Sequence, residues 1–380
     1  MKIIRNLLDN LRPHFAKGGK LGMFHALFDA TDNFLLSSGE LTSGGSHIRS
    51  SNNLKRLMFT VMIALVPATL FGIWNIGYQH YMAIGTCPNL WTAFLFGLGK
   101  YLPIVVVTYL SGLAVEVTFC QIRGHQVAEG FFVTGMMIPL ILPPDIPLWI
   151  VAVATIFATL FAKEVFGGTG MNFMNPALVA RAFIFFAYPS VISGDKIWIA
   201  ELPDTVSGAT PLATAPLSGV CNLPDPITLF LGLTPGSVGE TSVLAILLGA
   251  ILLICTGVAS WKIMLSVTAG GVLTGLAFNL IGQTPYMQVP FYYHLLMGGF
   301  AFGAVFMATD PVTASHTKYG KVIVGLLIGT LAIVLRVLNP AYPEGMMLAI
   351  LIMNVFTPLI DHIVVRCAIR KRKRFLDKQC

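Results

Sequence analysis

The sequence predicts an all-α polytopic membrane protein, with about ten transmembrane helices in a 5+5 inverted repeat that contains short, broken helices. Three observations support this fold class. Of the 380 residues, 55% are hydrophobic and only 11% are charged, whereas soluble domains carry about 25% charged residues. Apolar runs long enough to span a bilayer recur along the chain. Segments of the first half also reappear, in the same order, in the second half.

Ten apolar runs are candidate transmembrane helices, because the hydrocarbon core of a bilayer is about 30 Å thick and takes about 20 residues of helix. The third and eighth runs are short and contain or adjoin proline and glycine. The predicted spans are 56–77, 98–120, 128–142, 147–163, 174–192, 242–258, 262–281, 293–308, 322–338 and 346–366.

Basic residues at both ends of the chain predict the orientation, since Lys and Arg concentrate in cytoplasmic segments. Both termini are therefore expected in the cytoplasm, which requires an even number of spans. The loop 193–241 has five acidic residues against one lysine, so it is expected outside. Lys163 is predicted to fall in or beside an inner loop. Arg181, within a span, and Arg336, near an outer end, fit this scheme less well.

This topology divides the chain into five segments. The external loop 193–241 separates two five-helix repeats, 56–192 and 242–366. A cytoplasmic extension, 1–55, precedes the first repeat and lacks the apolar core of a signal peptide. A basic tail, 367–380, follows the second repeat.

The net charge and the cysteines exclude several classes of function. The formal charge of +7 reflects membrane topology and predicts no nucleic-acid partner, although the basic tail is suited to contact anionic membrane lipid. The six cysteines are scattered, and no pair has the CxxC spacing of a zinc site. They are interpreted as small buried apolar residues, without a metal or a disulfide framework.

Three pairs of similar segments define the predicted repeat. YLSGLAVEV (109–117) resembles VLTGLAFNL (272–280), TGMMIPLILPPD (134–145) resembles FGAVFMATDPVT (302–313), and NFMNPALVARAF (172–183) resembles NVFTPLIDHIVV (354–365). Because the first half holds five spans, an odd number, the second half must be inverted in the membrane. Inverted repeats with broken helices are common in transport proteins, whose sites lie where the broken helices meet. We therefore expect the functional centre at the third and fifth helices of each half.

Three acidic residues require an explanation, because a charge at the centre of a bilayer costs about 2.5–3.5 kcal/mol. Glu116 lies in SGLAVEV, Asp310 in FMATDPVT and Asp361 in TPLIDHI, and the repeat aligns none of them with another acid. Hard cations prefer oxygen ligands, so the acids indicate cation handling. The alternative is a position near an interface or an ion pair, with Arg181, Arg336 or His362 as partners.

The segment GGTGMNFMNPAL (167–178) is not interpreted as a phosphate loop, because no strand precedes it and the chain has no βαβ unit. Asn172 and Asn175 offer amide donors and acceptors, which match the mixed donor and acceptor edge of a flavin ring. The alternative is a helix N-cap and turn before the fifth span, with Pro176 in the first helical turn.

The stretch DTVSGATPLA (204–213) is small, polar and turn-forming, and it lies in the external loop. The small residues around Thr210 leave its hydroxyl sterically open, so that an enzyme can approach it and attach a group. The alternative from composition is a plain surface loop.

The pattern D-x-x-S-G-A-T in an external loop of a ten-span protein resembles the covalent flavin site of one family. This family comprises the B subunit of the sodium-pumping NADH:quinone oxidoreductase (NQR) and the related D subunit of the Rnf electron-transfer complex. The resemblance implies that Thr210 carries FMN through a phosphoester bond, made by a separate flavin transferase. The attachment motif would consist of Asp204, Ser207, Gly208 and Ala209.

The resemblance covers nearly the whole chain. GGTGMNFMNPAL, FMATDPVT and PEGMMLAILIMNVFTPLID (343–361) are similar to family signatures. In the extension, FAKGGK (15–20), DATDNFLLSSGE (29–40) and HIRSSNNLKRLMFTV (47–61) resemble the B subunit of the sodium pump, since the Rnf subunit lacks most of this segment.

The resemblance also implies further ligands and their residues. Riboflavin, bound without a covalent link, is expected near Asn172 and Asn175, and ubiquinone or menaquinone near Gly112 and Glu116. Where the family has a second glycine, this chain has Leu113, which bears on the shape of the quinone pocket. The residues implied in the Na⁺ pathway are Glu116, Asp310 and Asp361.

The implied activity is that of one subunit in a redox-driven sodium pump of the bacterial inner membrane. NADH is oxidised on another subunit, electrons pass through flavins to quinone, and Na⁺ is exported. Partners would be the A, C, D, E and F subunits of the pump, with the flavin loop in the periplasm. Two alternatives stay open: an Rnf-type D subunit that works with ferredoxin and NAD, and a non-redox transporter or channel on the same scaffold.

Overall fold

The computed structural model describes residues 54–123, 130–192, 197–201, 208–219, 223–339 and 344–377, and within these ranges it is helical and contains no β-strand. Five of its helices are long and apolar enough to cross a membrane. They are α3 (Leu54–Ile84), α4 (Leu90–Arg123), α12 (Trp261–Ile281), α15 (Lys318–Leu338) and α16 (Gly345–Leu376). The predicted all-α polytopic fold is confirmed.

Shorter apolar helices occupy the remaining predicted spans. Three of them are α5 (Gly130–Ile141), α7 (Pro176–Ala187), which is followed by the short α8 (Pro189–Ile192), and α11 (Val243–Cys255). The fourth predicted span is α6 (Leu148–Ala158), which continues directly into a π-helical turn, η2 (Thr159–Glu164). Segments of π-helix are rare in proteins, and those that occur are often found at functional sites.

The eighth predicted span, 293–308, is broken into three pieces. These are α13 (Phe291–Leu296), α14 (Phe300–Phe302) and the π-helical η4 (Gly303–Met307). The external loop carries two short helices of its own, α9 (Pro211–Ser218) and α10 (Pro226–Leu231). The predicted broken helices are therefore present.

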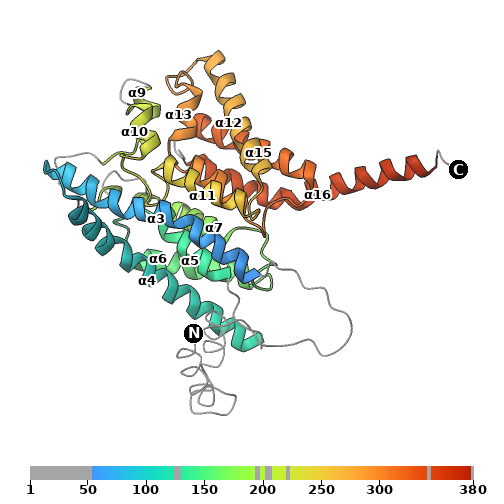
Figure 1. Cartoon of the computed structure of the whole chain (residues 1–380), viewed down its shortest axis with the longest axis horizontal. Helices are drawn as coiled ribbons and strands as arrows, with labels where there is room; N and C mark the ends of the chain where they lie inside the picture. Colours follow the sequence, from blue (N-terminus) through green and yellow to red (C-terminus); the bar gives the residue numbers. More distant parts are fainter. Residues whose placement is uncertain are drawn as a thin grey trace, which may run out of the picture.

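The helices form two sets of five with similar packing. In the first set, α4 packs on α5 and α6, and α6 packs on α7; in the second, α12 packs on α13 and α15, and α15 packs on α16. The first helices of the two sets, α3 and α11, lie against each other (Figure 1). This parallel order of contacts supports the predicted repeat.

Glycine allows α12 and α15 to approach closely, and this is the most extensive helix pair. A Cβ added to Gly270 would collide with the carbonyl group of Leu326, and one added to Gly329 would collide with that of Val267. Small residues at such contacts are typical of helix packing in membranes, where close van der Waals contact drives association.

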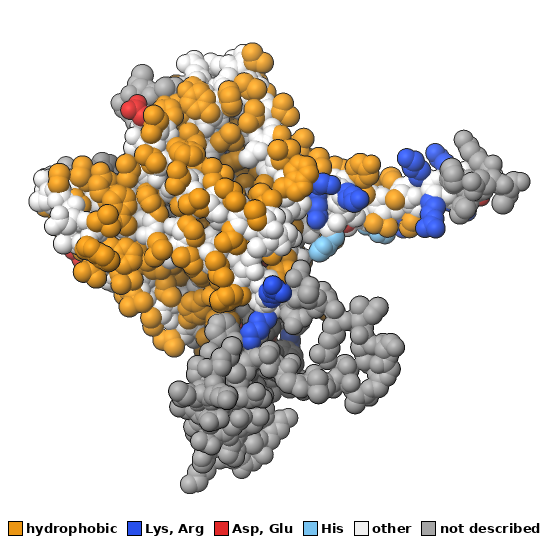
Figure 2. All heavy atoms as spheres, viewed as in Figure 1, with side chains coloured by type: hydrophobic (Ala, Val, Ile, Leu, Met, Phe, Trp, Pro, Cys, Tyr) orange, Lys and Arg blue, Asp and Glu red, His pale blue; other side chains and the backbone are white. Residues whose placement is uncertain are grey.

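Hydrophobic side chains cover much of the visible surface of the helical body (Figure 2). Among them, Leu110, Ile251 and Leu273 are each more than half exposed. An apolar surface of this extent is suited to lipid or partner subunits.

Several helices run further than the predicted spans, and α4 (Leu90–Arg123) does so at both ends of the predicted span 98–120. Helix α3 continues from the predicted end at residue 77 to Ile84, and α16 continues from residue 366 to Leu376. The last turns of α16 extend beyond the body of the molecule and carry basic side chains (Figures 1 and 2). A helix can continue past the apolar run because its backbone hydrogen bonds are made within the helix itself.

Two candidate functional pockets

Thr210 is the N-cap residue of α9, and Pro211 occupies the first helical position. The carbonyl of Thr210 accepts hydrogen bonds from the backbone N–H groups of Ala213 (2.9 Å) and Thr214 (3.2 Å). An N-cap threonine commonly uses its side-chain oxygen for the same purpose, but the Thr210 side chain makes no cap hydrogen bond. Its hydroxyl is therefore not used to begin the helix.

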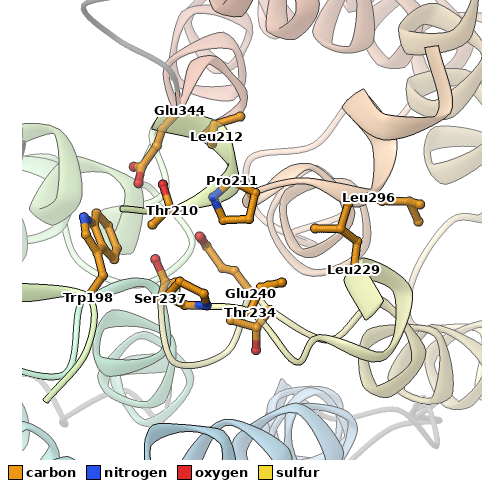
Figure 3. Close-up of a pocket in the computed structure, with 14 residues that line it drawn as sticks. Trp198, Thr210, Pro211, Leu212, Leu229, Thr234, Ser237, Glu240, Leu296 and Glu344 are labelled. Atoms are coloured by element: carbon orange, nitrogen blue, oxygen red, sulfur yellow. The ribbon is translucent and has the colours of Figure 1, made fainter. Parts of the chain in front are cut away.

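The Thr210 side chain lines a cavity with about 430 Å³ of empty space, which we call the outer pocket. Figure 3 shows Trp198, Glu240 and Glu344 around Thr210. The lining residues are Trp198, Thr210, Pro211, Leu212, Leu229, Thr234, Pro235, Gly236, Ser237, Glu240, Thr241, Leu296, Gly298 and Glu344.

Arg181 holds two walls of the outer pocket. Its Nε donates to Glu344 Oε2 at 3.0 Å, and its Nη2 forms an ion pair with Glu344 Oε1. The guanidinium carbon also lies 5.7 Å from the centroid of the Trp198 ring, within the distance of a cation–π interaction. Arg181 thus fixes an aromatic and an acidic side chain of the pocket relative to each other.

Glu240 is the second acid of the outer pocket. It lies in the loop before α11 and is buried, and its Oε1 has no hydrogen-bond partner within the described residues. Burial raises the pKa of Glu240 to about 8, although the positive charge of Arg181 opposes this change. The raised pKa favours the protonated, neutral form of Glu240, in which the carboxyl group can donate a hydrogen bond to a ligand.

The predicted attachment motif is only partly within the described ranges. Gly208 is buried, Ala209 is half-buried and Thr210 is half-buried. Asp204 and Ser207 lie outside the described residues.

Asn172 and Asn175 line a second cavity, the inner pocket, with about 410 Å³ of empty space. It brings together residues from α3, α5, η2, the loop before α7 and the segment after η4. Its lining residues are Met58, Gly130, Val133, Thr134, Met137, Lys163, Thr169, Asn172, Asn175, Pro176, Asp310 and Val312. The pocket thus involves the third element of each half and the fifth of the first half, but α16 does not line it.

The hydrogen bonds of the two asparagines are mainly local. Asn175 is the N-cap of α7: its Oδ1 accepts from the N–H of Ala177 at 2.9 Å, with Pro176 next in the chain. Asn172 accepts from the N–H of Gly170 (3.2 Å) and donates to the carbonyl of Met174 (3.2 Å). The alternative interpretation as a cap and turn is confirmed, and both residues also line the cavity.

The loop that leads to Asn172 needs glycine. Gly167, Gly168 and Gly170 have φ values of 118°, 93° and 95°, which residues with a Cβ rarely adopt. In the same loop the hydroxyl of Thr169 is buried and has no hydrogen-bond partner within the described residues. This hydroxyl is thus a buried polar group without a partner at the wall of the inner pocket, which Thr169 lines.

The three predicted acids occupy different settings. Asp310 lines the inner pocket and accepts a hydrogen bond from Thr313 Oγ1 at 2.9 Å. Asp361 is half-buried and accepts from Ser315 Oγ (2.7 Å) and from the backbone N–H of His316 (2.9 Å), so it holds the loop before α15.

Glu116 is buried and forms an ion pair with Lys163 Nζ. Lys163 is the second-last residue of η2 and lies beside a loop, as predicted, but its side chain is buried and it lines the inner pocket. The alternative of an ion pair is confirmed for Glu116, with Lys163 as the partner, whereas Arg181 and Arg336 have other partners. Arg181 pairs with Glu344, and Arg336 donates to the carbonyls of His294 (2.7 Å) and Met297 (3.3 Å).

Gly112 lies one turn before Glu116 on the buried face of α4. A Cβ on Gly112 would collide with the ring of Phe131 from α5, while Leu113 is half-buried. Neither Gly112 nor Glu116 lines the outer or the inner pocket. The quinone site therefore stays a prediction.

The site residues predicted from the sequence do not include Lys163, Trp198, Glu240 or Glu344. The one available signal was the pair Lys163 and Glu164, two adjacent charges at the end of a predicted span. Trp198, Glu240 and Glu344 lie outside the predicted spans, in segments whose neighbours in space depend on how the helices pack. Their place in a pocket could therefore not be predicted from local sequence.

The fold and the pockets define a polytopic helical membrane protein with polar cavities between broken helices, an arrangement typical of membrane transport proteins. A profile of the NQR2, RnfD, RnfE family matches residues 41–370. The chain belongs to this family.

Several curated relatives are named as the B subunit of Na(+)-translocating NADH-quinone reductase. The protein from Chromohalobacter salexigens is 47% identical, over 98% of this chain and 96% of its own length. The protein from Stutzerimonas stutzeri is 46% identical, over 97% and 98% respectively. The one from Azotobacter vinelandii is 45% identical, again over 97% of this chain and 98% of its own length.

Proposed function

We propose that this chain is the B-type membrane subunit of a Na⁺-translocating NADH-quinone reductase. It passes electrons from NADH, oxidised on another subunit, to ubiquinone or menaquinone, and this transfer is coupled to Na⁺ export. The similarity to subunits of that name over nearly the full length of the chain supports the assignment. The chain would be one part of a larger enzyme and would not act alone.

The outer pocket is proposed to hold FMN on a phosphoester bond to Thr210. The observation that carries this part is the Thr210 hydroxyl, which makes no cap hydrogen bond and lies at the wall of the outer pocket. Trp198 offers an aromatic face, and neutral Glu240 offers a proton donor. Flavin bound there supplies the redox chemistry, while the chain supplies position, electrostatics and insulation from water.

The inner pocket is proposed to hold riboflavin without a covalent bond. Asn172, Asn175 and the hydroxyl of Thr169 supply polar groups on one side, and Met58, Val133 and Met137 supply apolar surface. This combination of a mainly apolar lining and a few polar groups is typical of cofactor sites.

Na⁺ is proposed to pass the carboxylates of Glu116, Asp310 and Asp361, with quinone near Gly112 and Glu116. Asp310 is suited to this role because it lines the inner pocket. Asp361 already accepts several hydrogen bonds at the start of α15, so its carboxylate is held in one place.

The proposed setting is the bacterial inner membrane, with both termini in the cytoplasm and the Thr210 loop in the periplasm. The partners are the A, C, D, E and F subunits of the pump, a flavin transferase for maturation, and membrane lipid around the apolar surface.

Covalent flavin attachment is the test of this function. The complex is expressed in a host with the flavin transferase, separated on a denaturing gel and viewed under ultraviolet light. Wild type is expected to give a fluorescent band, with a mass increase of one FMN on the Thr210 peptide. Thr210→Val should give a dark band of equal amount, and the control Thr214→Ala, on the same helix, should stay fluorescent.

A dark wild-type band from the competent host would contradict the covalent flavin. The non-redox transporter predicts a colourless purified protein. An Rnf-type subunit predicts a fluorescent band that co-purifies with ferredoxin-linked partner subunits.

A further inference from the structure

Lys163 links two groups of residues that the sequence analysis treated separately. Its side chain lines the inner pocket together with Asn172 and Asn175. Its ammonium group also forms an ion pair with Glu116 of α4. One buried cation therefore contacts the acid predicted for Na⁺ and quinone and faces the cavity proposed for riboflavin.

The surroundings of this ion pair exclude most water. Lys163 is 3% exposed and Glu116 is 1% exposed, and the centroid of the Phe131 ring lies 5.6 Å from Lys163 Nζ. The neighbouring Glu164 is buried as well, and its Oε2 has no hydrogen-bond partner within the described ranges. Charges interact several times more strongly in such surroundings than in water, so a change of charge in the cavity acts strongly on Lys163.

We propose that Lys163 is a positioning residue that couples the charge of a flavin in the inner pocket to Glu116. This inference rests on the proposed function of that pocket. When the flavin in the inner pocket is reduced, it gains negative charge. This charge attracts the Lys163 ammonium group and so competes with the Glu116 carboxylate for the same cation. The Glu116 carboxylate is then less neutralised and is available to a second cation, such as Na⁺, which prefers oxygen ligands.

No covalent bond forms or breaks in this role, and Lys163 keeps its proton. The electron comes from NADH on the partner subunit and leaves toward quinone, as in the proposed function. Lys163 contributes only its charge and its position, so its effect is measurable as a change in the redox potential of the bound flavin.

The two members of the ion pair have opposite expected effects on that potential. Replacing Lys163 with Met removes a positive charge beside the cavity, which makes reduction harder and moves the midpoint potential to more negative values. Replacing Glu116 with Gln leaves the ammonium without its neutralising partner and moves the potential to more positive values. A purely structural role for the pair predicts no such opposition of sign.

The experiment is a spectroelectrochemical titration of the purified complex. All variants also carry Thr210→Val, which removes the proposed covalent FMN. The flavin left on this chain is then the extractable riboflavin. The variants are Lys163→Met, Lys163→Arg, Glu116→Gln and the double variant Lys163→Met with Glu116→Gln. Lys100→Met is the matched control, since Lys100 lies on α4 and forms ion pairs with Asp145 and Glu201 away from the inner pocket. Riboflavin content is measured in each preparation.

The expected result is a negative shift for Lys163→Met, a positive shift for Glu116→Gln, and potentials near wild type for Lys163→Arg and Lys100→Met. If Lys163→Met fails to assemble, the double variant is compared with Glu116→Gln, from which it differs only at Lys163, and it should have the more negative potential. Equal potentials in that comparison, with riboflavin retained, would overturn the role of Lys163. Wild-type complex without riboflavin would instead overturn the proposed function of the pocket.

Discussion

Arg181 of α7 and Glu344, the residue before α16, form an ion pair that joins the two five-helix sets across 163 positions of sequence. Arg181 is fully buried, whereas the Glu344 side chain is 18% exposed. Glu344 lines the outer pocket, and Arg181 holds it in place. The contact that joins the two helix sets therefore also stabilises the wall of the pocket.

Removing one member of this pair is expected to destabilise the protein strongly. Glu344→Gln takes this counter-charge away from the buried Arg181 guanidinium, and the loss of one partner of a buried pair costs about 3–5 kcal/mol. Asp145→Asn breaks the more exposed pair with Lys100, where about 1 kcal/mol or less is expected. Thermal unfolding of the purified complex measures both, and equal melting temperatures for the two variants would contradict a structural role of Arg181 and Glu344.

Asp361 has two separable roles, an anchor for the loop before α15 and the proposed passage of Na⁺. Asp361→Ala removes both and should lower Na⁺-stimulated quinone reduction. Asp361→Asn keeps a side-chain acceptor but loses the charge, so it should also lower Na⁺ stimulation. Ser315→Ala removes one hydrogen bond to the carboxylate, at a cost of about 1.5–3 kcal/mol in stability, and should keep Na⁺ stimulation.

Steady-state quinone reduction against Na⁺ concentration distinguishes these roles of Asp361. Unchanged activity and unchanged Na⁺ dependence in Asp361→Ala would remove this residue from the Na⁺ pathway.

A larger residue at Gly112 should displace the ring of Phe131. The added methyl of Gly112→Ala has no space beside that ring, and overpacking of this kind costs about 1–3 kcal/mol. Gly99→Ala is the matched control on the same helix, because nothing lies within 4 Å of its added Cβ. We expect a raised KM for quinone and a lowered Tm only in Gly112→Ala, with partial rescue by Phe131→Leu. The same values in both alanine variants would refute this account.

Glu240 should make the stability of the protein fall as pH rises. Its pKa is raised by burial from 4.5 to about 8 in the folded state, so the folded protein holds a proton that the unfolded chain releases. The contribution is fully present below about pH 4.5 and is lost as pH rises through about 8. Melting temperatures between pH 5 and 9 should decline less steeply in Glu240→Gln than in wild type.

Glu201 provides the contrast for this measurement. Its hydrogen bond with Lys100 lowers the pKa of the Glu201 carboxyl, so its contribution is lost as pH falls. Glu201→Gln should therefore leave the decline toward high pH unchanged. Parallel pH curves for Glu240→Gln and wild type would show that Glu240 does not carry the effect.

Local properties of the sequence were sufficient to predict the helical spans and one detail of the inner pocket. The length of an apolar run depends only on neighbouring residues, and the runs correspond to the helices from α3 to α16. The cap at Asn175 with Pro176 behind it is also local, because both act within one helical turn. The break in the predicted span 293–308 followed from its short length and its glycines.

Long-range pairs of charges could not be predicted in this way. Lys163 and Glu116 are 47 positions apart, and the partners considered from the sequence for the three acids did not include Lys163. In a chain with few charges, each buried charge must find a partner, but the choice of partner depends on which helices pack side by side.

The sequence by itself determined that this chain is a polytopic membrane protein, where its helices lie, and which family motifs it carries. These features depend on composition, on the length of apolar runs and on short patterns. Only the tertiary structure decided that Thr210 faces a cavity with Glu240 and Glu344, and that Lys163 stands between Glu116 and the inner pocket. The physical reason is that pockets and buried ion pairs are made by side chains from different helices, and their juxtaposition is fixed by packing.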